Sequence, residues 1–227
     1  MTKRQVFITG GTGYLGRPLV SRLLERGYDV RALVRPGSEV RVPAGCKAIP
    51  GNALIGSSYS AHIQAGDTFV QLVGVSHPNP SKAAEFRGVD LVSAMGAIEA
   101  ARNAGVGHFV YLSVAQPAPM MKAYLAVRAE CEAALRASGL NATILRPWYV
   151  LGPSHRWPYA LMPVYWLLER IPATRTGARR LGLVTLEQMV CALTSAVENP
   201  CQGVRFIEVP EIRSSSGFSE VSAEILR

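Results

Sequence analysis

Residues 6–16 read Val-Phe-Ile-Thr-Gly-Gly-Thr-Gly-Tyr-Leu-Gly, and this stretch decides the fold. Its apolar first half predicts a buried strand, and the residues after it carry leucine and valine at helical spacing. Between the two, Gly10, Gly13 and Gly16 permit a tight turn, close approach of a phosphate and close packing of helix on strand. The helix would direct its free N–H groups at that phosphate. A strand, spaced glycines and a helix in this order predict a dinucleotide-binding site.

The rest of the chain alternates between strand and helix patterns. Gly27 follows the first helix where a helix end favours a left-handed residue, and the later helices end at Gly105 and Gly139. Predicted strands cover 29–34, 46–49, 68–73, 108–112, 142–145 and 204–209, and predicted helices cover 81–104, 122–137 and 185–198. This alternation predicts an α/β fold with a doubly wound parallel sheet of the Rossmann type. A Ser-rich tail is expected from about Arg213.

The length of 227 residues suits one α/β domain with a small appended lobe. The pattern breaks at Gly152-Pro153, so we expect a nucleotide-binding core over 1–153 and, over 154–227, a small C-terminal lobe that completes the fold and covers the substrate site. The stretch 157–168 is dense in aromatic and aliphatic residues. It is either core, which such clusters usually are, or an apolar substrate lid, or a partner surface.

The composition excludes several classes of protein. Hydrophobic residues make up 48% of the chain and charged ones 18%, which is typical of a globular protein. The net charge is +8, but the basic residues are dispersed and no nucleic-acid-binding motif occurs, so no nucleic acid is expected. Neither a signal peptide nor a membrane-spanning run is found, which predicts a cytoplasmic protein. The four cysteines and four histidines lack ligand spacing, so no metal site is expected.

Arg35 decides which dinucleotide we expect. In this fold an acidic residue at the end of the second strand usually accepts hydrogen bonds from the ribose of NAD, and this chain has Arg35 at that place. A guanidinium there suits a 2′-phosphate, since it offers paired donors and a permanent charge. The sequence therefore favours NADP(H) over NAD(H), unless Arg35 is a solvated loop residue.

Several short motifs carry a resemblance to a known family. Besides the glycine loop, Tyr111-Leu112-Ser113 ends a strand, Tyr124 precedes Arg128 by four residues on a helix, and Arg146-Pro147 ends another strand. With these motifs the chain resembles the short-chain dehydrogenase/reductase superfamily. It is most similar to the atypical members grouped with NAD-dependent epimerase/dehydratase and NmrA-like proteins. The resemblance covers residues 1–153 well and the remainder weakly.

The resemblance implies a set of catalytic residues. Ser113 would orient a substrate oxygen and Tyr124 would transfer its proton. Arg128 stands where the family has a lysine that binds the nicotinamide ribose and lowers the tyrosine pKa. Arginine can supply a charge there but cannot relay a proton. The alternative is that Ser113 is a strand-end hydroxyl and Tyr124 a half-buried helix residue.

Binding residues follow from the same reasoning. Asn52 replaces an aspartate that in relatives contacts the adenine amino group, and it keeps a hydrogen-bond acceptor. The expected cofactor-binding residues are Gly10, Gly11, Thr12, Gly13, Tyr14, Leu15, Gly16, Arg35, Asn52, Leu72, Val73, Gly74 and Pro147. The substrate candidates are Trp148, Trp157 and Tyr159, although Trp148 could equally be core.

These observations predict a cytoplasmic NADP(H)-binding oxidoreductase or epimerase-like enzyme, a monomer or homodimer, acting on a small carbonyl or hydroxyl compound. The apolar segment favours an apolar or aromatic substrate, whereas Arg175, Arg179 and Arg180 leave a phosphorylated one open. The alternative is a non-catalytic NADP(H)-binding redox sensor or assembly factor of the NmrA-like kind. The presence of Arg128 in place of the family's lysine is the feature that distinguishes the two hypotheses.

Overall fold

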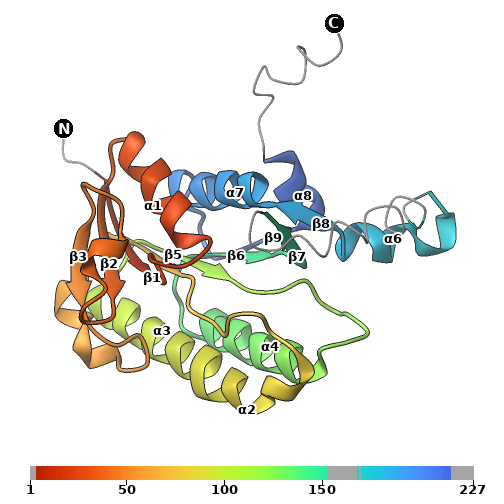
Figure 1. Cartoon of the computed structure of the whole chain (residues 1–227), viewed down its shortest axis with the longest axis horizontal. Coiled ribbons are helices and arrows are strands. Elements are labelled where there is room, and N and C mark those ends of the chain that lie inside the picture. Colours follow the sequence, from red (N-terminus) through yellow and green to blue (C-terminus); the bar gives the residue numbers. More distant parts are fainter. Residues whose placement is uncertain (1–3, 153–167, 169, 216–227) are drawn as a thin grey trace, which may run out of the picture.

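The computed structural model describes residues 4–152, 168 and 170–215, and its centre is a seven-stranded parallel sheet (Figure 1). The strand order is β3-β2-β1-β4-β5-β6-β9, and every neighbouring pair is parallel. The strands are β1 (Gln5–Thr9), β2 (Asp29–Val34), β3 (Lys47–Pro50), β4 (Thr68–Gln71), β5 (His108–Leu112), β6 (Ala142–Arg146) and β9 (Val204–Glu208). The predicted doubly wound Rossmann-type sheet is confirmed.

The topology places a crevice beside β1. The chain builds outward from β1 through β2 to β3, then crosses back so that β4 pairs with the other side of β1. Thr9 at the end of β1 lies level with Leu33 of β2 and Gln71 of β4. In parallel sheets the loops that leave such a switch point diverge to opposite faces, and ligands bind between them.

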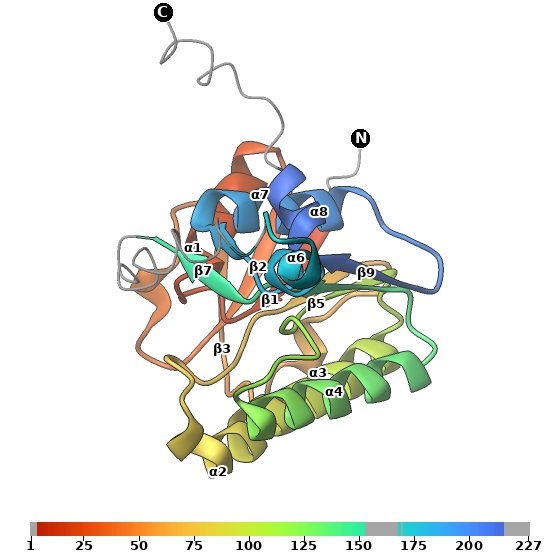
Figure 2. The same cartoon turned by 90° about the vertical axis from the view of Figure 1, so that its right-hand side faces the viewer.

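Helices cover both faces of the sheet. On one face lie α1 (Gly16–Glu25), α7 (Leu186–Glu198) and α8 (Val209–Ser214), and on the other lie α2 (Ala83–Glu85), α3 (Val92–Ala104) and α4 (Lys122–Ala137) (Figures 1 and 2). Successive strand residues point to opposite faces, so each layer has its own core. In β1, for example, Val6 and Ile8 pack in the cluster with α1 and α7, whereas Phe7 packs in the cluster with α3 and α4.

The helix predicted over 81–104 consists of several segments. A short 3₁₀ turn (Pro80–Lys82) leads into α2, a π-helical segment follows over Phe86–Leu91, and α3 continues to Ala104. Gly105 then ends the helix in the predicted left-handed conformation, with φ of 68°. The π-helical segment buries both Phe86 and Asp90. Such widened turns are rare and often lie at functional sites.

The C-terminal third differs from the prediction in several elements. Two short strands, β7 (Tyr149–Leu151) and β8 (Leu183–Thr185), form a separate parallel pair, and α6 (Pro172–Arg180) precedes β8. The Ser-rich tail was predicted from about Arg213, but α8 continues through this residue to Ser214. Within the described part of the chain, no helix is both long and apolar enough to cross a membrane. Trp157 and Tyr159 lie outside the described residues.

Candidate functional site

The glycine loop between β1 and α1 is as tight as its sequence requires. Gly10 has φ of 77°, and its carbonyl oxygen accepts a hydrogen bond of 3.0 Å from the Gly13 amide. A Cβ on Gly16 would overlap that same carbonyl oxygen, and a Cβ on Gly11 would come within 2.9 Å of the Ala32 side chain. Among the described residues, no side chain caps the start of α1. The Arg17 amide donates a hydrogen bond of 3.1 Å to the Gly13 carbonyl and Pro18 has no N–H, so at the start of α1 the Gly16 amide is the group available to a bound phosphate.

The loop opens on a cleft made of two adjoining cavities. The first, the Arg35 cavity, has a volume of about 460 Å³ and is bounded by the ends of β2 and β3 and by the π-helical segment; its residues include Thr12, Leu33, Val34, Arg35, Asn52, Val73 and Val89. The second, the Trp148 cavity, has a volume of about 580 Å³; its residues include Tyr14, Leu15, Val75, Ser76, His77, Asn79, Trp148 and Tyr149. Both are lined by Gly10, Gly13, Leu72, Gly74 and Ser76, so they form one continuous groove.

Most of the expected cofactor-binding residues line this groove. The exceptions are Gly11 and Pro147. Gly11 is buried against Ala32 beneath the loop, where it allows close packing rather than contact with a ligand. The Pro147 carbonyl accepts a hydrogen bond of 2.8 Å from the Ala115 amide and so ties two strand ends together. Trp148, expected at the substrate end, does line its cavity.

Arg35 and Asn52 flank the first cavity in different ways. Arg35 follows the last residue of β2, is exposed, and makes no side-chain hydrogen bond or ion pair with the described residues. Asn52 is engaged within its own loop, because its Oδ1 atom accepts a hydrogen bond of 3.0 Å from the Leu54 amide. The Arg35 guanidinium therefore keeps its donors for a ligand, whereas the side-chain acceptor of Asn52 is already occupied.

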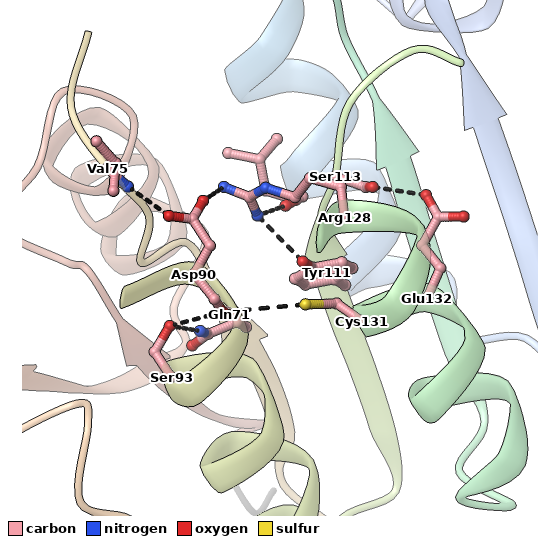
Figure 3. A network of polar contacts seen from close by, with 10 residues as sticks. Gln71, Val75, Asp90, Ser93, Tyr111, Ser113, Arg128, Cys131 and Glu132 are labelled. Carbon is pink, nitrogen blue, oxygen red and sulfur yellow. Dashed lines mark hydrogen bonds and ion pairs between the residues drawn. The ribbon is translucent and has the colours of Figure 1, made fainter. Parts of the chain in front are cut away.

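Arg128 is buried and does not line the groove. Figure 3 shows the polar contacts of its guanidinium. Its Nη2 atom lies 2.5 Å from Oδ1 of Asp90, and its Nη1 atom donates to the Leu112 carbonyl at 2.8 Å and to the Tyr111 hydroxyl at 3.1 Å. Burial acts to lower the pKa of Arg128, but Tyr111, Tyr124 and Asp90 raise it well above its ordinary value. The guanidinium is therefore a permanently charged member of a buried network.

Ser113 belongs to a second buried network. Its hydroxyl donates a hydrogen bond of 2.5 Å to Oε1 of Glu132, which lies one helical turn after Arg128 on α4 (Figure 3). The guanidinium of Arg146, at the end of β6, pairs with the same carboxylate and also with Glu208, 2.9 Å away. The Ser113 hydroxyl thus connects β5 to α4.

Tyr124 lies at the start of α4, half-buried. Its ring centroid is 4.9 Å from that of Phe86, and the Arg128 guanidinium carbon is 5.1 Å from the centroid of the Tyr124 ring. The structure therefore brings Tyr124 and Arg128 together, as the resemblance implies. Neither they nor Ser113 are among the residues that line the groove.

Sequence reasoning missed Asp90 and Glu132, the two carboxylates that hold the candidate catalytic residues. It also missed His77 and its neighbours on the rim of the Trp148 cavity, where His77 has left-handed backbone with φ of 51°. Positive φ in a non-glycine residue beside a cavity is unusual. The only sequence signals for these two carboxylates were an aspartate in the helical pattern over 81–104 and one of two glutamates in the pattern over 122–137.

Comparison with known proteins shows which family the chain resembles. A family model described as NAD(P)H-binding matches residues 10–159. Ceramide reductase from Caulobacter vibrioides is 27% identical over 218 residues, which cover 92% of this chain and 65% of that protein. The photosystem II assembly factor Ycf39 from Cyanophora paradoxa is 29% identical over 151 residues, which cover 62% of this chain and 44% of that protein. The chain thus spans less than two thirds of the length of these curated relatives.

Among solved structures, the Bordetella bronchiseptica enzyme WbmH in complex with NAD⁺ has a TM-score of 0.68 at 20% identity. The match covers 91% of this chain and 76% of WbmH. At this level of identity the likeness concerns the fold.

Proposed function

Because this chain belongs to the NAD(P)H-binding family, whose model spans residues 10–159, we propose that it binds NADP(H) in preference to NAD(H). The observation that carries this preference is the position of Arg35. Its exposed guanidinium lies at the rim of the Arg35 cavity, directly after β2, where an acidic residue would favour the free ribose of NAD. A 2′-phosphate would supply the anion that this cation lacks.

The groove offers a place for each part of the dinucleotide. The Arg35 cavity, with the aliphatic side chains of Leu33 and Val89, suits adenine and its phosphorylated ribose. The glycine loop and the uncapped end of α1 suit the pyrophosphate. The Trp148 cavity suits the nicotinamide half. When bound, the cofactor would supply a hydride at the nicotinamide ring.

The preference is tested by titrating the protein with NADPH and with NADH. We expect tighter binding of NADPH, and we expect Arg35→Ala to weaken NADPH binding about tenfold or more, which corresponds to the loss of a charge-assisted contact. Binding of NADH should change little. Arg41→Ala is the matched control, because Arg41 is exposed and lies outside the groove. Tighter NADH binding, with no effect of Arg35→Ala on NADPH, would overturn the preference.

For the role of the bound dinucleotide, we propose a binding function, as in a redox sensor or an assembly factor, rather than catalysis by the tyrosine–lysine mechanism. This proposal is supported by Arg128, which stands where the family has its lysine but is committed to Asp90, Tyr111 and Leu112. The likeness to Ycf39 agrees with it.

A reductase is the second candidate function. It is favoured by the likeness to ceramide reductase along 92% of the chain and by the retention of Tyr124 beside a cation. As a reductase the protein would transfer a hydride from NADPH to a carbonyl carbon while Tyr124 gave its proton to the oxygen.

A measurement of catalytic turnover distinguishes the binding function from the reductase. NADPH oxidation is followed with a panel of aliphatic, aromatic and long-chain ketones, on protein already shown to bind NADPH. The binding function predicts no oxidation with any ketone. Oxidation that is abolished by Tyr124→Phe, with NADPH affinity unchanged, would establish the reductase instead.

A further inference from the structure

We infer that Asp90 and Arg128 form a positioning pair that holds the backbone of Gly74 and Val75 as one wall of the groove, and thereby sets the affinity for the nicotinamide half of the dinucleotide. This inference rests on the proposed binding of NADP(H). Neither residue contacts the ligand in this proposal. Both act through the wall between them and the groove.

The carboxylate of Asp90 links the wall to the guanidinium. Its Oδ1 atom lies 2.5 Å from Nη2 of Arg128, and its Oδ2 atom accepts a hydrogen bond of 3.0 Å from the Val75 amide (Figure 3). The Asp90 side chain is fully buried and that of Arg128 is only 5% exposed. In such a place water cannot substitute for a lost partner, so the geometry of the pair fixes the position of the Val75 amide.

The guanidinium itself supports Gly74 from behind. A Cβ on Gly74 would overlap Nη2 of Arg128 and would approach Oδ1 of Asp90 to 3.0 Å. Gly74 lines both cavities, so its backbone separates the groove from the ion pair. The side chain of Arg128 is anchored in turn by the Leu112 carbonyl at the end of β5. The wall thus rests on a fixed point of the sheet.

The π-helical segment explains why Asp90 can serve this purpose. It presents Val89 to the Arg35 cavity and buries the next residue, Asp90, against Arg128. One segment therefore contacts the adenine side directly and the nicotinamide side through the ion pair. Widened helical turns commonly place functional side chains in this way.

The effect should be confined to one half of the ligand. Val75 lines only the Trp148 cavity, and the chain continues from it through Ser76 to Asn79 along the same rim. The rim has two further attachments: Lys82 Nζ donates to the Ser76 carbonyl at 2.9 Å, and Asn79 at the far end caps the turn that follows. Loss of the Asp90 anchor would release the end nearest the phosphates and the nicotinamide ribose.

The test compares NADPH with adenosine 2′,5′-bisphosphate, which carries only the adenine half of NADPH. For Asp90→Asn we expect the dissociation constant for NADPH to rise about tenfold. Without the anchor, the backbone of Gly74 and Val75 must become ordered when NADPH binds, and this ordering reduces the affinity. The dissociation constant for the bisphosphate should stay within about twofold of the wild type. If Asp90 had only a structural role, the dissociation constants for NADPH and for the bisphosphate would change together or not at all.

The matched control is Asp67→Asn. Asp67 also forms an ion pair in which both side chains are nearly fully buried, with Arg31 at 2.7 Å, and it lies at the opposite end of β4 from the groove. We expect this variant to lose stability but to keep both dissociation constants. Thermal unfolding of each variant is recorded alongside, so that binding is measured where the protein is folded. Arg128→Lys, which keeps the charge but removes the guanidinium behind Gly74, gives the same comparison if Asp90→Asn does not fold.

The outcomes are distinct. A selective loss of NADPH affinity in Asp90→Asn or Arg128→Lys, absent from Asp67→Asn, supports the positioning pair. Equal losses for NADPH and the bisphosphate, or unchanged binding of both, overturn it while the proposed function stands. Wild-type protein that binds neither ligand overturns the proposed function, and the positioning pair with it.

Discussion

The hydroxyl of Ser113 donates a hydrogen bond of 2.5 Å to Oε1 of Glu132, and both residues are almost completely buried. A hydrogen bond to a buried charged group contributes more to stability than one at the surface. The relationship gives Ser113 a structural use that is independent of any substrate, because it ties the end of β5 to the middle of α4.

Ser113→Ala should therefore lower the free energy of unfolding by about 2 kcal/mol and leave the affinity for NADPH unchanged. Urea denaturation and a NADPH titration measure the two quantities. Ser57→Ala, at an exposed serine, is the control and should change stability by less than about 0.5 kcal/mol. If Ser113→Ala is as stable as the wild type, the hydrogen bond to Glu132 does not hold the two elements together.

Gly16→Ala should damage the dinucleotide site. The added Cβ would overlap the carbonyl oxygen of Gly10, and neither atom can move without shifting the loop or the start of α1. We expect NADPH affinity to fall more than about tenfold and stability to fall by about 1–3 kcal/mol. Binding and thermal unfolding check this expectation.

Gly177→Ala provides the comparison for that variant. Gly177 lies inside α6, and no atom of the described residues lies within 4 Å of the Cβ that alanine would add. This substitution should keep NADPH affinity and add up to about 1 kcal/mol of helix stability. Equal effects of the two substitutions on binding would contradict the role assigned to Gly16.

Thr185 caps α7, and removal of that cap is a test of how the C-terminal elements are held. Its Oγ1 accepts a hydrogen bond of 3.1 Å from the Gln188 amide, while the Gln188 side chain accepts one of 2.9 Å from the Thr185 amide. Thr185→Ala should cost about 1 kcal/mol of unfolding free energy, whereas Thr185→Ser should cost much less because serine retains the acceptor. Urea denaturation distinguishes the two variants, and equal losses would show that the hydroxyl is not what matters.

The sequence predicted those helices and strands in which apolar residues recur with a clear helical or strand period. The strands around β1 and the long helix α4 were predicted within two residues of their ends, and α3 ends at the predicted residue, but the stretch before α3 divides into several segments. The pair β7 and β8 was missed because strands of three residues are too short to show alternation. α8 was missed although Pro210 and Glu211 are start signals, because the serines that follow are typical of a tail.

In the site, too, the features formed by neighbouring residues could be predicted, whereas contacts between residues far apart in the sequence could not. The glycine loop is a local motif, so its residues could be placed from the sequence. The partners of the candidate catalytic residues could not, since Asp90 is 38 positions from Arg128 and Ser113 is 19 from Glu132. Only the folded sheet brings them together, and a π-helical segment, which has no clear sequence signature, sets the position of Asp90.

The buried His108 should make the protein less stable in mild acid. Its Nε2 atom lies 3.0 Å from the Thr143 hydroxyl, and Arg205 donates to that same hydroxyl at 3.1 Å. Burial, and after it the charge of Arg205, lowers the pKa of His108 from 6.5 to about 4. The folded protein therefore keeps this imidazole neutral where the unfolded chain already binds a proton. Stability from this residue is present above pH 6.5 and is lost as the pH falls from there towards 4.

The size of the effect follows from the width of that window. Each pH unit within it costs about 1.4 kcal/mol, so the free energy of unfolding should fall by about 2 kcal/mol between pH 7 and pH 5 on account of His108 alone. His108→Gln cannot bind the proton and should lack this component, whereas His62→Gln, at an exposed histidine, should follow the wild type. Urea denaturation at several pH values measures the three profiles. Parallel profiles for the wild type and His108→Gln would mean that the buried imidazole does not couple folding to pH.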